Sequence, residues 1–286
     1  MTKSSIEQPE PMSLEEGTSM QQGRYIAANG LDIYYEEYGE GEPLLLLHGG
    51  TATVQSWQQH IPAFAPHFRV IALDSRGHGK TNNPAGELSY SMMAADVAAF
   101  IQALDLEKPL VLGYSDGGQI ALELGMRYPD LASALVLGGT CYRFPEQYFE
   151  ALKGFGVVPS GAVTVERMQI ESPEWVEYLK TEHARADDSD YWQTLMKQIS
   201  SLWWNVQDYR IEDLEKITAP TLIILGDRDE GAGLEQAVEM YRYIPNAELA
   251  VLPNADHGTA FGELSIPLML DFLMRHNTRT EPGETQ

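Results

Sequence analysis

One stretch of the sequence decides the fold: Pro109-Leu-Val-Leu-Gly113-Tyr114-Ser115-Asp116-Gly117-Gly118. Its first half is a short apolar run typical of a buried strand, and a helix-like stretch begins near Gln119. Between them lies the pattern G-x-S-x-G, whose small flanking residues let the backbone turn sharply without a Cβ clash. A strand that passes through such a turn into a helix projects a serine hydroxyl above the sheet edge. We therefore predict that Ser115 is a nucleophile.

A serine hydroxyl is a poor nucleophile at neutral pH, so a general base and a group that orients the base must accompany it. Two later segments supply candidates, each directly after an apolar run. One is Gly226-Asp-Arg-Asp229 and the other is Asn254-Ala-Asp-His257-Gly258. We predict His257 as the base and Asp229 as the orienting acid, with Asp227 as the alternative acid. The resulting chain order is Ser, Asp, His.

Short apolar runs and helix-like stretches alternate along most of the chain. The expected strands are Pro43 to Leu47, Arg69 to Leu73, Pro109 to Leu112, Ala134 to Leu137, Thr221 to Leu225 and Leu249 to Leu252. The expected helices are Trp57 to Phe64, Met92 to Leu104, Gln119 to Arg127, Leu234 to Tyr243 and Ile266 to Met274. Continuous apolar runs are typical of strands that are buried on both faces. Their alternation with helices predicts an α/β sandwich with a mostly parallel sheet. Before it, Asn29-Gly30 predicts a tight hairpin between Arg24 to Ala28 and Leu31 to Tyr38.

The alternation stops between residues 141 and 216, where no buried-strand run occurs. Twelve of the 27 aromatic residues fall between 141 and 210. We expect an inserted helical cap over a pocket, with Trp192, Met196, Trp203 and Trp204 as candidate lining residues. The alternative is that these side chains only pack the cap. The predicted organisation is a flexible leader at 1–22, a core at 23–140 and 217–278, the cap at 141–216, and a flexible tail at 279–286.

Composition limits the partners of the chain. The 286 residues include 19 Lys plus Arg and 42 Asp plus Glu, a formal net charge of −23. Such a charge repels phosphate backbones and anionic lipids, so neither nucleic acid nor a membrane is an expected partner. Small neutral or cationic molecules are the expected ligands, although the acidic excess also fits a role in solubility alone. With no apolar N-terminal region or spanning segment, the expected location is cytoplasmic.

No cofactor or metal is expected. The one cysteine, Cys141, rules out a multi-thiolate site within one chain and is expected as a small buried residue. Neither an H-E-x-x-H pattern nor a phosphate-binding loop occurs in the sequence. The five histidines at 60, 67, 78, 183 and 276 are expected on the surface or in turns, because none follows the last buried strand.

A glycine-rich turn ends the first apolar run, in Leu44-Leu-Leu-Leu-His48-Gly49-Gly50-Thr51. Its backbone N–H groups can face a developing oxyanion. We assign the predicted oxyanion hole to the amides of Gly50 and Asp116, where a donor can contribute roughly 3 kcal/mol. His48 is expected to be structural.

Together these motifs resemble those of the α/β-hydrolase superfamily, over about residues 24 to 276. The resemblance rests on His48-Gly49-Gly50, the D-x-R-G-x-G turn at Asp74 to Gly79, the nucleophile elbow, Gly226 to Asp229, and His257. It implies an α/β-hydrolase sandwich, and it favours Asp229 over Asp227 because Asp229 takes the fourth position of the family's G-x-x-D pattern. It also implies that the Asp74 turn orders a loop beside the site.

The elbow Gly113-Tyr-Ser-Asp-Gly-Gly118 is similar to that of the biphenyl hydrolase-like proteins, which cleave amino-acid esters such as valacyclovir. The resemblance implies that Asp116 holds a substrate ammonium group. A carboxylate beside the nucleophile also destabilises an oxyanion, which calls for a compensating cation. The alternative is that Asp116 is hydrogen-bonded at the helix N-terminus, where carboxylates are favoured.

The expected activity is cofactor-independent serine hydrolysis of a carboxylic ester or lactone, with an amine-bearing substrate such as an amino-acid ester or a macrolide-type lactone as one hypothesis. Carbon–carbon hydrolysis of a ring-fission product uses the same residue types and is the alternative reaction. A ligand sensor that kept the fold without turnover is the alternative from another class. Epoxide hydrolases and haloalkane dehalogenases need an aspartate nucleophile, so Ser115 disfavours both.

Overall fold

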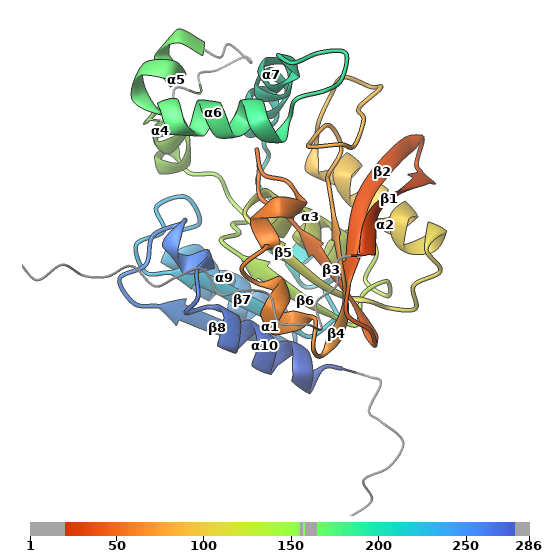
Figure 1. Cartoon of the computed structure of the whole chain (residues 1–286). Helices are drawn as coiled ribbons and strands as arrows, with labels where there is room; N and C mark the ends of the chain where they lie inside the picture. The colour runs from red at the N-terminus through yellow and green to blue at the C-terminus, as the bar shows by residue number, and fades with distance from the viewer. Residues whose placement is uncertain (1–20, 155–156, 158–164, 278–286) are drawn as a thin grey trace, which may run out of the picture.

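An eight-stranded sheet forms the centre of the computed structural model, which describes residues 21–154, 157 and 165–277 (Figure 1). The strands lie in the order β1-β2-β4-β3-β5-β6-β7-β8, and all neighbours from β4 to β8 run parallel. Their bounds are β1 Gln21–Ala28, β2 Leu31–Tyr38, β3 Glu42–Leu47, β4 Phe68–Leu73, β5 Leu110–Tyr114, β6 Ala134–Gly138, β7 Thr221–Gly226 and β8 Ala247–Leu252. The predicted mostly parallel sheet is confirmed.

The predicted hairpin is present at the antiparallel edge. Strands β1 and β2 pair from Ala28 opposite Leu31, and β2 continues the antiparallel pairing onto β4. Asn29 and Gly30 connect the two strands with φ angles of 49° and 74°. Asparagine and glycine tolerate this left-handed conformation, which matches the twist of the strands.

Helices cover both faces of the sheet because successive residues of each buried strand point to opposite sides. Leu45 and Leu47 pack in one cluster with α2 (Tyr90–Ala103), α3 (Asp116–Arg127) and α9 (Leu234–Tyr243). Leu44 and Leu46 pack in a second cluster with α1 (Ile61–Phe64) and α10 (Ile266–Arg275). The continuous apolar runs are therefore explained by burial on two sides.

The helix expected from Trp57 to Phe64 is wrong as a continuous element. A 3-10 turn, η1, spans Val54–Trp57, and α1 begins only at Ile61. Pro62 lies in the first turn of α1. Because proline lacks the N–H and clashes with the residue one turn before it, a helix cannot run through this position without distortion. The other expected helices are present with small shifts at their ends.

Among the described residues, five helices lie between β6 and β7: α4 Glu146–Gly154, α5 Val165–Glu171, α6 Pro173–Glu182, α7 Tyr191–Trp204 and α8 Ile211–Leu214. Helices α4 to α7 gather on one side of the sheet layer and have a small core of their own, which includes Leu152, Leu179 and Trp192 (Figure 1). Leu214 of α8 instead belongs to the main core. The predicted leader, apart from Gln21 and Gln22, and the predicted tail lie outside the described residues.

Two side-chain contacts fix the turn at Asp74 to Gly79. Asp74 accepts hydrogen bonds from the backbone N–H groups of Val54 and Lys80, both at 2.9 Å. Arg76 donates two hydrogen bonds to Asp96 of α2, at 2.7 and 2.6 Å, in a pair that is buried on both sides. The turn is thus held to η1 and α2.

No helix in the described part of the chain is long and apolar enough to cross a bilayer.

Candidate active site

Ser115 lies at the junction of β5 and α3 in a left-handed backbone conformation, with φ 55° and ψ −119°. The residues around it must be small because the chain packs closely on itself. A Cβ atom on Gly113 would lie 2.1 Å from the carbonyl oxygen of Gly117, and one on Gly117 would lie 1.9 Å from that of Leu47. Glycine at both positions permits the sharp turn that places Ser115 at the sheet edge.

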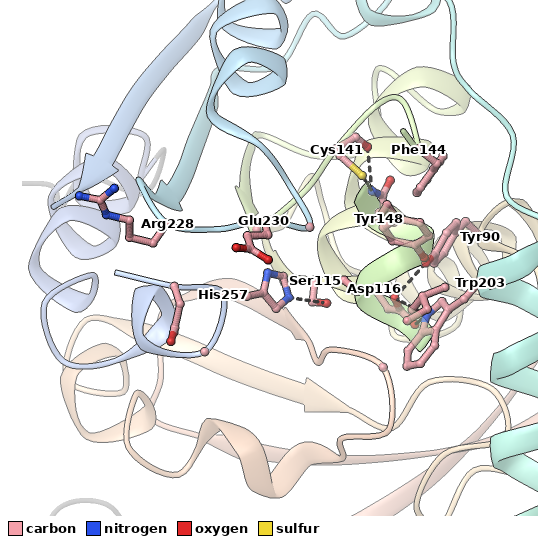
Figure 2. Close-up of a pocket in the computed structure, with 18 residues that line it drawn as sticks. Tyr90, Ser115, Asp116, Cys141, Phe144, Tyr148, Trp203, Arg228, Glu230 and His257 are labelled. Atoms are coloured by element: carbon pink, nitrogen blue, oxygen red, sulfur yellow. Dashed lines mark hydrogen bonds between the residues drawn. The ribbon is translucent and has the colours of Figure 1, made fainter. Parts of the chain in front are cut away.

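The structure brings together the three residues that the sequence predicts as nucleophile, base and acid. Nε2 of His257 lies 3.0 Å from Oγ of Ser115, and Nδ1 of His257 lies 2.8 Å from Oδ2 of Asp229 (Figure 2). Ser115 follows β5, Asp229 follows β7, and His257 follows β8, so the carboxyl ends of nearby parallel strands supply all three. Asp227 instead accepts a hydrogen bond from the N–H of Ala255.

Contacts on each side of the histidine set its electrostatics. Burial lowers the pKa of His257, but the Asp229 carboxylate outweighs this effect and raises the pKa above the ordinary 6.5. Burial raises the pKa of Asp229, yet hydrogen bonds from His257 and from the N–H groups of Ala232 and Gly231 lower it overall. Asp229 is therefore held as a carboxylate, and it fixes the histidine with Nδ1 protonated and Nε2 facing the serine.

A cavity of about 710 Å³ lies against Ser115 and His257. Figure 2 shows an aromatic end on one side of Ser115, formed by Tyr90, Phe144, Tyr148 and Trp203. On the other side is a charged end with Arg228 and Glu230. Asp256 also lines the cavity. The Arg228 side chain is mostly exposed and lies 3.8 Å from the Asp227 carboxylate. The lining thus contains more carboxylates than cations.

The Asp116 carboxylate has two side-chain donors. Tyr90 donates its hydroxyl to Oδ1 at 2.9 Å, and Nε1 of Trp203 lies 3.0 Å from Oδ1 and 2.9 Å from Oδ2. Burial raises the pKa of Asp116 to about 6, although both hydrogen bonds act to lower it. Neither donor is a helix N-terminus, which was one of the two sequence-based alternatives. Asp116, which lies beside the nucleophile, instead connects α2 and α7 to the start of α3.

Gly50 and Asp116, the residues of the predicted oxyanion hole, both line the cavity. A Cβ atom on Gly50 would lie 2.5 Å from Oδ2 of Asp116 and 2.6 Å from Cζ2 of Trp203. The glycine-rich turn after β3 therefore approaches the start of α3 and the end of α7 closely. The position requires glycine for this contact.

Only one of the four side chains predicted from the helices between β6 and β7 lines the cavity. Trp203 does so, whereas Trp192 and Met196 are buried in the separate core of helices α4 to α7. Trp204 stacks on Phe149, with ring centroids 5.1 Å apart. The predicted lining roles of Trp192, Met196 and Trp204 are wrong, because an apolar stripe on a helix first serves helix packing.

Several lining residues were not predicted, among them Tyr90, Gln119, Tyr148 and Glu230. Gln119 carries a signal in the sequence, because it lies four residues after Ser115, one turn along the helix that begins there. Tyr90 and Tyr148 carry no such signal. Their places depend on how distant helices pack.

Three of the histidines expected on the surface or in turns, His60, His78 and His183, lie in turns or bends of the chain and are buried there. His183 accepts from the N–H of Gly79 at 3.0 Å and lies 2.8 Å from the carbonyl oxygen of Thr51. His48 accepts from the N–H of Ser75 at 3.0 Å, and burial lowers its pKa to about 4. These contacts link loops around the cavity, and sequence order alone cannot distinguish such a role from exposure.

No group of three or more His, Cys, Asp or Glu side chains within the described ranges could hold a metal ion. Cys141 is buried and lines the cavity, where burial raises the pKa of its thiol to about 12. The thiol is therefore protonated at neutral pH and is a poor nucleophile.

A family model for the alpha/beta hydrolase fold matches residues 42–263. This chain is an α/β hydrolase. A 2-hydroxy-6-oxo-6-(2'-aminophenyl)hexa-2,4-dienoic acid hydrolase of Metapseudomonas resinovorans is 27% identical to it over 250 residues, which cover 82% of this chain and 84% of the relative. A putative non-heme chloroperoxidase of Synechocystis sp. is 27% identical over 272 residues, covering 85% and 95%.

Among solved structures, a meta-cleavage product hydrolase (CumD) matches this α/β hydrolase with a TM-score of 0.71. The match covers 88% of this chain and 98% of the other, at 23% sequence identity. The names of the relatives include both a hydrolase and a peroxidase, so membership of the family leaves the reaction to be argued from the site.

Proposed function

We propose that this α/β hydrolase is a cofactor-independent serine hydrolase that cleaves a carboxylic ester or lactone. The observation that carries the proposal is the contact series Ser115 Oγ, His257 Nε2, His257 Nδ1 and Asp229 Oδ2, with lengths of 3.0 and 2.8 Å, open to a cavity. This is the geometry in which a histidine takes the proton of a serine hydroxyl and an acid orients the histidine.

In the proposed mechanism, His257 accepts the Ser115 proton as Oγ attacks the substrate carbonyl. The amides of Gly50 and Asp116 stabilise the oxyanion, and Asp229 stabilises the imidazolium. His257 then gives its proton to the leaving alcohol, so that an acyl group remains on Ser115. Water attacks this acyl-enzyme with His257 again as the base, releasing the acid and restoring Ser115.

The charge of the cavity supports an ester that carries no carboxylate. Asp116, Glu230 and Asp256 line it, whereas Arg228 is exposed and already lies near Asp227. An anionic substrate would be repelled, while a neutral or amine-bearing one would not. We keep the amino-acid ester or aminated lactone as the finer hypothesis. Because Asp116 already has two donors, the charged end is the better candidate for contact with an amine.

Carbon–carbon hydrolysis is the second candidate, favoured by the similarity to the aminophenyl hexadienoic acid hydrolase over most of both chains. It needs the same nucleophile and base, so the contacts at Ser115 fit it equally. A dienoic acid is ionised at neutral pH, however, and the excess of carboxylates in the cavity opposes its binding.

A direct test combines labelling with two substrates. A fluorophosphonate probe is expected to label Ser115 in the native protein. Purified enzyme is expected to hydrolyse 4-nitrophenyl butanoate faster than a ring-fission dienoate. Turnover of the dienoate alone would establish the carbon–carbon reaction instead. Absence of both labelling and turnover would leave a ligand sensor on the same fold.

The pH dependence of kcat/KM is expected to show a limb on the acidic side controlled by His257. Only neutral His257 can accept the serine proton, and the Asp229 carboxylate raises the His257 pKa above 6.5. Activity is therefore expected to rise as the pH increases through that raised pKa and to be lost below it. A profile measured from about pH 5 to 9 covers the transition. A rate that is already maximal at the acidic end would contradict the assigned base.

A further inference from the structure

Gln119 lines the cavity, and its buried amide has an acceptor without a partner among the described residues. Its Nε2 donates to the carbonyl oxygen of Cys141 at 2.7 Å and contacts Sγ of Cys141 at 3.3 Å. The carbonyl oxygen of Cys141 requires a donor, so the amide atom that faces it is Nε2 and the other is Oε1. The other end, Oε1, is buried and has no hydrogen-bond partner among the described residues. The side chain is only 4% exposed and lines the cavity.

A buried acceptor without a partner is costly to the folded protein, by about 1–3 kcal/mol. Such groups are uncommon in folded proteins and call for an explanation. At the wall of a cavity beside a nucleophile, a substrate donor that completes the missing hydrogen bond is one such explanation. The fixed direction of the amide then selects a donor and rejects an acceptor.

The position of Gln119 on α3 places this acceptor near the reacting carbonyl. The N–H of Gln119 donates to the carbonyl oxygen of Ser115 at 2.9 Å, so the two residues are one helical turn apart. Both residues also line the cavity. A group bound at Oε1 therefore lies in the same cavity as a carbonyl carbon attacked by Ser115.

The direction of proton transfer indicates which part of the substrate is bound there. His257 protonates the leaving alcohol in the proposed mechanism, so that alcohol must lie beside Nε2 of His257. Gln119 belongs to the helix that Ser115 begins, and Cys141, its partner, lies on the side of Ser115 away from His257 in Figure 2. The acyl portion is the part of the substrate on that side.

We propose that Oε1 of Gln119 is a specificity determinant that accepts a hydrogen bond from a hydroxyl group on the acyl portion of the substrate. The class of substrate is thus a hydroxyacyl ester or a hydroxylated lactone. The amide oxygen carries no charge, so it replaces the hydration of a hydroxyl better than that of an ammonium ion. This inference rests on the proposed ester hydrolysis.

The test compares 4-nitrophenyl 3-hydroxybutanoate with 4-nitrophenyl butanoate. The wild-type protein is expected to prefer the hydroxy ester in kcat/KM by about tenfold, since one buried acceptor gains its partner. In Gln119→Met, which keeps a side chain of similar length without an acceptor, the ratio of the two kcat/KM values is expected to fall to about one. The ratio is the readout, so a general loss of rate in the variant does not affect it.

Gln102→Met is the matched control, because it makes the same change at an exposed position of α2 outside the cavity lining. Its ratio is expected to stay as in the wild type. A 3-amino ester serves as a third substrate, and a preference for it over the hydroxy ester would overturn the choice of a hydroxyl.

Two failures are distinguishable. If the wild type hydrolyses both esters without preference, or if the preference persists in Gln119→Met, the Gln119 inference is overturned while ester hydrolysis stands. If neither ester is hydrolysed and the fluorophosphonate probe does not label Ser115, the proposed function itself fails. If Gln119→Met does not fold, Gln119→Leu, which also lacks the acceptor, takes its place, and a wild type without preference overturns the inference in either case.

Discussion

Replacing Ser115 with alanine is expected to lower kcat for ester hydrolysis by on the order of 10⁶-fold, because loss of the nucleophile removes the acyl-enzyme route entirely. Oγ of Ser115 is the atom that Nε2 of His257 approaches at 3.0 Å. Binding groups and the backbone amides remain, so a residual rate above that of water is expected. Steady-state kinetics with 4-nitrophenyl butanoate and loss of fluorophosphonate labelling measure the effect.

Ser133→Ala is the control for this experiment. Ser133 lies just before β6, away from the cavity lining, and its buried hydroxyl has no hydrogen-bond partner in the described part of the chain. Removing that hydroxyl is expected to leave labelling and turnover near the wild-type values. Retention of activity in Ser115→Ala, or an equal loss in both variants, would refute Ser115 as the nucleophile.

The second large effect is expected at the acid. Asp229→Asn is expected to lower kcat by on the order of 10⁴-fold, because an amide can hold His257 in the wrong tautomer and cannot stabilise its charged form. The Asp229 carboxylate also raises the pKa of His257. The acidic limb of the residual activity is therefore expected to move to lower pH, which a pH profile of kcat/KM detects.

Asp227→Asn separates the two candidate acids. Asp227 is two residues from Asp229, but it contacts the N–H of Ala255 and Arg228 rather than His257. We expect a loss within about tenfold, as for a change that disturbs only a neighbouring loop. A larger loss in Asp227→Asn than in Asp229→Asn would reverse the assignment.

The central sheet could be predicted because the residues of each strand show by themselves that the strand is buried. A strand buried on both faces must be apolar at every position, as Leu44 to Leu47 are, and this run cannot be confused with an amphipathic helix of normal length. Asn29 and Gly30 mark the hairpin for a similarly local reason, since few other residues tolerate their φ angles. Where two local signals conflict, as at Pro62, the prediction was wrong.

The positions of Ser115, Asp229 and His257 could be predicted because each directly follows a recognisable strand. Parallel strands place their carboxyl ends at one sheet edge, so chain order and strand order together bring the three residues near one another. The partners of Asp116 could not be predicted in this way. Tyr90 and Trp203 belong to different helices, and their contacts depend on packing between segments far apart in the sequence.

The helices between β6 and β7 show most clearly what the sequence alone does not predict. Trp192 and Trp203 lie on the same helix and are the same residue type, yet one is buried in a core and the other lines the cavity. A hydrophobic periodicity identifies which face of α7 is covered but not what covers it. Only the arrangement of α4 to α6 distinguishes packing from substrate contact.

The place of β8 in the sheet has a consequence for how the protein loses function. In the described sheet β8 is the last strand, with β7 as its neighbour, and most of its residues are only partly buried. Edge strands open locally at a lower free-energy cost than central ones, as amide hydrogen exchange reveals in many proteins. Opening of β8 would carry His257 away from Ser115 while the central strands stayed paired. Gentle heating or a low concentration of denaturant can therefore abolish catalytic activity in molecules whose central sheet is still folded. Resistance to inactivation then depends on the stability of β8 more than on that of the core.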